Sequence, residues 1–76
     1  MTDKKQLQLA IGKRIKKLRE QREIPQQDLA AKCNLEKSNL SRLEAGGTNP
    51  TIYTLLRIAD SLDVSLCDIV TLDLKD

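Results

Sequence analysis

Residues that end or interrupt helices occur at short intervals in this sequence, and their spacing limits the chain to short elements. Pro25 disfavours helix in the residue before it. Asn34 and the pair Gly46-Gly47 tolerate the left-handed backbone with which helices end, and Asp63 interrupts the next apolar stretch. Between these breaks, apolar residues recur three or four positions apart, which is the spacing of one helix face. The sequence therefore predicts five short helices joined by short loops.

The predicted helices account for most of the chain. We expect them from about Lys5 to Arg22, from about Gln26 to Cys33, from Glu36 or Lys37 to about Ala45, from Thr51 as N-cap through Leu62, and from Ser65 to about Val70 or Thr71. The side chains expected to be buried in the first and fourth helices are Leu7, Ile11, Ile15, Leu18, Ile52, Leu55, Leu56, Ile58, Ala59 and Leu62. Residues 70–76 alternate apolar and polar side chains, which fits either a short strand or a frayed tail.

Aromatic side chains are almost absent, because Tyr53 is the only one. The core must therefore be aliphatic, and such a core suits helices packed on helices better than a β-sandwich. With 76 residues, we expect one all-α domain over residues 1–76, with its core over about residues 7–70. A core of this size is marginal alone, so dimerisation would help it.

Several classes of protein and site are disfavoured by composition. The longest apolar runs have three residues, as at 9–11, which is too short to cross a membrane, and the polar residues 1–8 do not resemble a signal peptide. We therefore expect a cytoplasmic protein in which Cys33 and Cys67 are reduced rather than joined in a disulfide. The chain has no histidine, no Gly-rich phosphate loop and no metal cluster. We therefore expect no enzyme, no cofactor, no metal and no small-molecule ligand.

The charge is distributed unevenly along the chain. Residues 1–42 carry eleven Lys or Arg and five Asp or Glu, whereas residues 43–76 carry two and six. A basic half joined to an acidic half suggests one face for a polyanion and another face for a different contact. The alternative is that these charges are ordinary solvated helix faces.

The stretch from Gln26 to Leu43 carries the most specific pattern. Two short helices joined by about three residues must cross closely, which requires a small side chain such as Ala30 at the crossing. The turn needs a left-handed residue, which Asn34 supplies in place of the more usual glycine. The apolar anchors under both helices are Leu29, Leu35, Leu40 and Leu43. This is the spacing of a helix-turn-helix.

Four segments extend this pattern into a family resemblance: QQDLA at 26–30, Asn34-Leu35, LSRLEAG at 40–46 and Asn49-Pro50-Thr51. Together they resemble the phage repressor and Cro family, also called the Xre family, over residues 11–70. The resemblance implies that the third helix is a recognition helix in the major groove of double-stranded DNA. The base contacts that it implies are Lys37, Ser38, Asn39, Ser41 and Arg42. The implied phosphate contacts are Gln26, Gln27, Gly47, Thr48 and Asn49.

These residues also have interpretations that do not involve DNA binding, and the sequence departs from the family pattern at two positions. Lys37 and Arg42 could be solvated charges, and Ser38 and Asn39 could cap the third helix. Pro25 replaces the usual Ser or Thr N-cap of the second helix, and Glu36 stands where such a residue would cap the third. The carboxylate of Glu36 favours the helix dipole but repels phosphate, although it could accept from a cytosine amino group.

A structural ion pair is also implied by the resemblance. In similar proteins an arginine of the first helix pairs with the glutamate that ends the recognition helix, and Arg19 and Glu44 are at the matching positions here. We expect a partly buried pair that fixes the third helix against the first.

The function that we expect is sequence-specific DNA binding by a small prokaryotic transcriptional regulator, which could be a repressor, a controller or an antitoxin-like protein. Because one domain reads few base pairs, we expect a homodimer on a near-palindromic operator. The apolar C-terminal residues assigned to the interface are Leu66, Ile69, Val70, Leu72 and Leu74. These residues could instead close the core of the monomer. The alternative function is a protein-interaction module that uses the fourth and fifth helices, with a silent helix-turn-helix.

Overall fold

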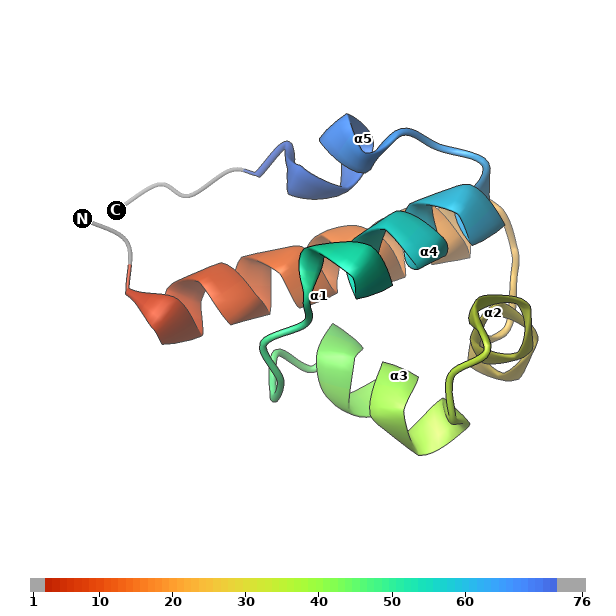
Figure 1. Cartoon of the computed structure of the whole chain (residues 1–76), viewed down its shortest axis with the longest axis horizontal. Coiled ribbons are helices and arrows are strands. Elements are labelled where there is room, and N and C mark those ends of the chain that lie inside the picture. Colours follow the sequence, from red (N-terminus) through yellow and green to blue (C-terminus); the bar gives the residue numbers. More distant parts are fainter. Residues whose placement is uncertain (1–2, 73–76) are drawn as a thin grey trace.

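The computed structural model describes residues 3–72, and all regular secondary structure in that range is helical (Figure 1). The helices are α1 (Lys4–Gln21), α2 (Gln26–Cys33), α3 (Lys37–Glu44), α4 (Ile52–Leu62) and α5 (Leu66–Val70). The predicted all-α class and the predicted order of elements are confirmed. In Figure 1, α2 and α3 lie on one side of α1 and α4, and α5 lies on the other side.

The helices end where the sequence predicts breaks. Asn34 and Asp63 follow α2 and α4 in the left-handed conformation, each with a φ of 58°. Glu23, two residues before Pro25, is also left-handed with a φ of 54°, and α1 ends at Gln21. Asn and Asp adopt this conformation more readily than other residues with a Cβ atom, because their short polar side chains bond locally.

Side-chain caps are present on only some of the helices. Asp3 and Ser65 form capping boxes at the starts of α1 and α5, and the hydroxyl of Thr51 accepts from the N–H of Thr54 in α4. Pro25 and Glu36 precede α2 and α3 without any side-chain cap. The two central helices of the predicted helix-turn-helix therefore begin with backbone N–H groups that no side chain satisfies.

Every helix contributes a large aliphatic side chain with no exposed surface to the core. In chain order these side chains are Ile15, Leu29, Leu40, Ile58 and Ile69, each 0% exposed. Cys33 is also buried, and this burial raises the pKa of its thiol. Among the described residues, both cysteines are free.

Three apolar side chains that we expected in the core lie at the surface instead. Leu7 is 38% exposed in the second turn of α1, and Ile52 is 72% exposed as the first residue of α4. Leu56 is 41% exposed because Leu55, Ile58, Ala59 and Leu62 already form the buried face of α4. The apolar stripe of α4 is therefore wider than the face that the other helices cover.

The described part of the C-terminal segment does not form the short strand that was one of the two expectations. Val70 ends α5, and Thr71 and Leu72 follow without regular secondary structure, so neither is in a strand. Residues 73–76 lie outside the described residues, and so does the predicted contact of Leu74. No helix within residues 3–72 has the length and apolar character that a membrane crossing requires.

Candidate nucleic-acid interface

The helix-turn-helix is formed by α2, three turn residues and α3. Left-handed Asn34 reverses the chain, and the next residue, Leu35, donates its N–H to the carbonyl of Ala30 at 2.8 Å. Ala30 is 2% exposed, so a small side chain lies where the two helices approach. Local residues of α2 therefore determine the direction in which α3 departs.

Arg57 of α4 holds this turn from a distant part of the chain. Its guanidinium donates to the carbonyls of Cys33 and Asn34, which are left without helical partners at the end of α2. The same guanidinium lies 5.5 Å from the centre of the Tyr53 ring, within cation–π range. Arg57 was not identified from the sequence, because a contact between residues 23 or 24 positions apart cannot be predicted from the spacing of neighbouring residues.

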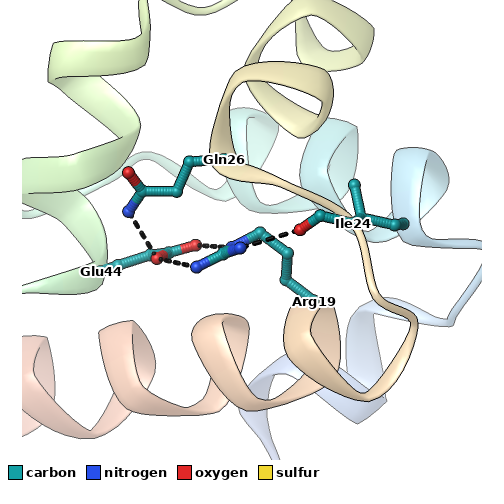
Figure 2. Close-up of polar contacts among 4 residues, drawn as sticks. All are labelled: Arg19, Ile24, Gln26 and Glu44. Carbon is teal, nitrogen blue, oxygen red and sulfur yellow. Dashed lines mark hydrogen bonds and ion pairs between the residues drawn. The ribbon is translucent and has the colours of Figure 1, made fainter.

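The ion pair expected between Arg19 and Glu44 is present and buried (Figure 2). Arg19 donates from Nε to Glu44 Oε2 at 2.7 Å and from Nη2 to Oε1 at 3.0 Å, which is a bidentate arrangement. Its Nη1 donates to the carbonyl of Ile24 at 2.8 Å. The hydrogen bonds to Glu44 raise the pKa of Arg19 above its already high ordinary value. Arg19 therefore stays charged and fixes the end of α3 to α1.

Gln26 belongs to the same network, which the sequence did not predict. Its Nε2 donates to Glu44 Oε1 at 2.8 Å, and Figure 2 shows its amide oxygen on the side away from that carboxylate. Gln26 is the first residue of α2, and one of its two amide N–H bonds remains for another acceptor. The network thus fixes the side chain that was predicted to bind a phosphate.

The predicted base contacts form the outer face of α3. Lys37, Ser38, Asn39, Ser41 and Arg42 are all exposed. The helix begins after Glu36, and no side chain caps it, so Ser38 and Asn39 are not its caps. Asn39 instead accepts a hydrogen bond from Arg42 Nη2 at 2.7 Å.

The loop after α3 supports only part of the predicted phosphate contact. The N–H of Gly47 donates to the carbonyl of Arg42 at 2.9 Å, so this N–H closes α3 and is not free for a phosphate. This corrects the expectation for the Gly47 backbone. Asn49 is exposed and Thr48 is half-buried. Gln27, in the first turn of α2, is also exposed.

An open groove of about 270 Å³ separates α3 from this loop and from the start of α4. Most of its lining is apolar, from Leu35, Leu43 and Pro50, and hydroxyl groups come from Thr48 and Thr54. Asn39 and Arg42 of α3 also line it. No group of three or more potential metal-binding side chains occurs in the part of the chain that the structure describes.

The residues assigned to a dimer interface divide into two kinds. Ile69 is 0% exposed inside the chain, which corrects the expectation that its side chain is available to a partner. Leu66 and Leu72 are half-buried against the core, whereas Val70 is 47% exposed. For Ile69, the alternative that the sequence left open is therefore correct, because its side chain closes the core of the monomer.

A known protein family matches the segment that contains this surface. The family model HTH_3, described as helix-turn-helix, matches residues 15–69. The immunity repressor protein of Bacillus phage phi105 is 37% identical over 62 residues, which are 82% of this chain and 43% of that repressor.

Solved structures agree with this match. An HTH_3 family transcriptional regulator from Vibrio cholerae superposes with a TM-score of 0.84 at 28% identity, over 88% of this chain and 38% of that one. SinR, a master regulator for biofilm formation solved in complex with DNA, superposes with a TM-score of 0.74 at 38% identity. That match covers 79% of this chain and 97% of the SinR chain in that structure. The chain thus spans less than half the length of the phage repressor and of the Vibrio regulator.

Proposed function

Because this chain belongs to the HTH_3 family of helix-turn-helix proteins, we propose that it regulates transcription by binding a specific DNA sequence with α3 in the major groove. The observation that carries the proposal is the polar outer face of α3. The C-terminal end of this helix is fixed by the buried ion pair of Glu44 with Arg19. A helix that reads bases must be held rigidly from behind, since small displacements misplace its hydrogen bonds.

The chemistry of α3 suits base edges. Lys37 and Arg42 have the donors that recognise guanine, Asn39 has the amide that can pair with adenine, and Ser38 and Ser41 can serve either kind of base edge. Gln26 and Gln27 in the first turn of α2, with Thr48 and Asn49 in the loop, are the proposed phosphate contacts. The excess of Lys and Arg in residues 1–42 would strengthen all DNA contacts electrostatically.

The proposed assembly is a two-fold homodimer that binds a near-palindromic operator. Two recognition helices about 34 Å apart would enter successive turns of the major groove, with half-sites about 10 base pairs apart. Exposed Val70, half-buried Leu66 and Leu72 and the end of α4 offer the surface for pairing. Repression is the proposed mode of action, supported by similarity to the phage immunity repressor.

The test is selection of bound sequences from a random duplex pool, followed by titration of variants on the selected site. Arg42→Ala should weaken specific binding by about 1–3 kcal/mol and relax discrimination at one base pair. Gln26→Ala should weaken binding to all sequences alike. Lys13→Ala, on the exposed side of α1, is the matched control.

The competing function is a protein-interaction module that uses α4 and α5. Exposed Ile52, Tyr53 and Leu56 on α4 are the observation in its favour. A salt-dependent gel shift on random DNA separates the two functions, because phosphate contacts weaken steeply as salt rises. If the parent binds no duplex at low salt, or if Arg42→Ala binds the selected site as tightly as the parent, the DNA-reading role of α3 is wrong.

A further inference from the structure

Asn39 and Arg42 contact each other on the exposed side of α3, and the core does not depend on this contact. Arg42 Nη2 donates to Asn39 Oδ1 at 2.7 Å, between side chains one helical turn apart. We infer that Asn39 is a positioning residue for Arg42, and that the two residues read a single base pair as one unit. This inference rests on the proposed function.

The hydrogen bond leaves Arg42 able to bind a base. A guanidinium has five N–H donors, and Asn39 occupies one of them. Four remain, and two of these can bind the paired acceptors of guanine. The ion pair between Arg19 and Glu44 is the one found within residues 3–72, so no described carboxylate pairs with Arg42. A neutral amide thus orients the guanidinium without neutralising its charge.

The same hydrogen bond makes separate adenine reading by Asn39 less favourable. An asparagine that reads adenine accepts from the base with its amide oxygen and donates with its amide nitrogen. Here the oxygen already accepts from Arg42. Asn39 would have to give up that bond or share its oxygen in order to read a base of its own.

Open space beside the pair gives this positioning a physical role. Asn39 and Arg42 are among the residues that line the groove of about 270 Å³ between α3 and the following loop. An arginine side chain has many rotamers, and ordering it on binding costs free energy. Without Asn39, the guanidinium would have more rotamers available in this open space, and the cost of ordering it at the base would rise.

The experiment compares discrimination at each base pair of the selected site for the parent, Asn39→Ala, Arg42→Ala and the double variant at fixed salt. Arg42→Ala should reduce discrimination at one base pair by about 10-fold or more. Asn39→Ala should reduce it at the same base pair by about 2- to 10-fold. The double variant should lose no more than Arg42→Ala, because the two substitutions remove one unit.

Asn39→Asp is the conservative variant, because it keeps an acceptor for Arg42 but lacks the amide donor. It should retain discrimination at that base pair while its charge weakens binding to every sequence. The inference is overturned if Asn39→Ala relaxes a different base pair, leaves the profile unchanged, or adds its full effect to that of Arg42→Ala. A parent that binds no DNA would instead contradict the proposed function itself.

A measurement on the free protein tests the contact without DNA. In NMR spectra of the Arg42 guanidinium, rotation should be restricted in the parent and in Asn39→Asp, and should be faster in Asn39→Ala. Free rotation in the parent would overturn the inference. Because both side chains are exposed, all variants should unfold at the parent's temperature, which shows that any changed profile is not a folding defect.

Discussion

Glu44 joins three helices through the two oxygens of one carboxylate. It is 6% exposed, it accepts from Arg19 of α1 and Gln26 of α2, and it is itself the last residue of α3. Every buried side-chain N or O atom in residues 3–72 has a hydrogen-bond partner. Removal of this one carboxylate would therefore leave a buried guanidinium without its partner, which is far costlier than loss of a surface pair.

For Glu44→Ala, we expect the free energy of unfolding to fall by about 3–5 kcal/mol. Urea unfolding at neutral pH measures it. Glu20→Ala removes an exposed carboxylate next to Arg19 and should change the same quantity by less than about 0.5 kcal/mol. Equal losses in both variants would show that overall charge, and not the buried network, is responsible.

Asp68 gives the residue-scale prediction for pH. Its carboxylate accepts from the backbone N–H and the hydroxyl of Ser65, and these hydrogen bonds hold the pKa of Asp68 below its usual 3.8. A lowered pKa stabilises the fold above the unfolded value, and this contribution is lost as pH falls through the folded value. NMR titration should find the pKa below 3.8, and Ser65→Ala should raise it. A pKa unchanged by Ser65→Ala would contradict the hydrogen bond from the Ser65 hydroxyl to this carboxylate.

At the scale of elements, Gly12 sets how closely α1 and α3 can approach. A Cβ atom at this position would lie 2.5 Å from the carbonyl oxygen of Leu43 and 2.6 Å from that of Glu44. Both obstacles are backbone atoms at the end of α3, so neither can rotate away. The proposed recognition helix, α3, therefore lies directly against the backbone of α1, next to the buried ion pair.

Gly12→Ala decides between two opposing effects. Alanine is a better helix former than glycine by about 1 kcal/mol, but overpacking costs about 1–3 kcal/mol and here requires a backbone shift. We expect overpacking to prevail and the unfolding midpoint in urea to fall. Lys13→Ala, one residue along on the exposed side of α1, should leave the midpoint nearly unchanged. A stabilised Gly12→Ala protein would show that the helices can separate without cost.

Local signals in the sequence predicted the elements better than they predicted the contacts between them. Pro25, Asn34 and Asp63 mark helix ends through their own backbone preferences, so these ends could be derived from single positions. Arg57 and Gly12 act on residues more than twenty positions away, and no local spacing records such contacts. The pair of Arg19 and Glu44 was predictable only because its positions match a family pattern.

The exposed polar face of α3 was predictable, but the division of roles within it was not. The sequence identifies Asn39 and Arg42 as outward residues, whereas their hydrogen bond depends on rotamers. For Ile69, even the direction in which the side chain faces could not be predicted from the sequence. An apolar residue near a terminus can face a partner or the chain's own core, and only the packing of α5 on α1 and α4 shows that Ile69 does the latter.

At the scale of the whole molecule, several apolar side chains remain uncovered. Val70 on α5 is 47% exposed, and Leu56 on α4 is 41% exposed. A small domain has little core to spare, so the association of two copies would stabilise it by covering such residues. The two positions allow a matched comparison of the possible pairing surfaces.

Sedimentation of Val70→Glu and Leu56→Glu tests the proposed dimer. The parent should sediment as a dimer at high micromolar concentration, Val70→Glu should be monomeric, and Leu56→Glu should stay dimeric. Dissociation by Leu56→Glu alone would move the interface to the outer side of α4. A parent that is monomeric at this concentration and binds one copy per asymmetric site would contradict the dimer.

The absence of side-chain caps on α2 and α3 has a consequence for how such a protein can evolve. A Ser, Thr or Asp in place of Pro25 or Glu36 would add about 1 kcal/mol of stability, as the caps of the other three helices do. The new side chain would bond the same backbone N–H groups that an anion at these helix ends would need. At these two positions, a stabilising cap and a bound polyanion would therefore use the same N–H donors. Selection for higher thermal stability would oppose selection for tighter binding of the polyanion.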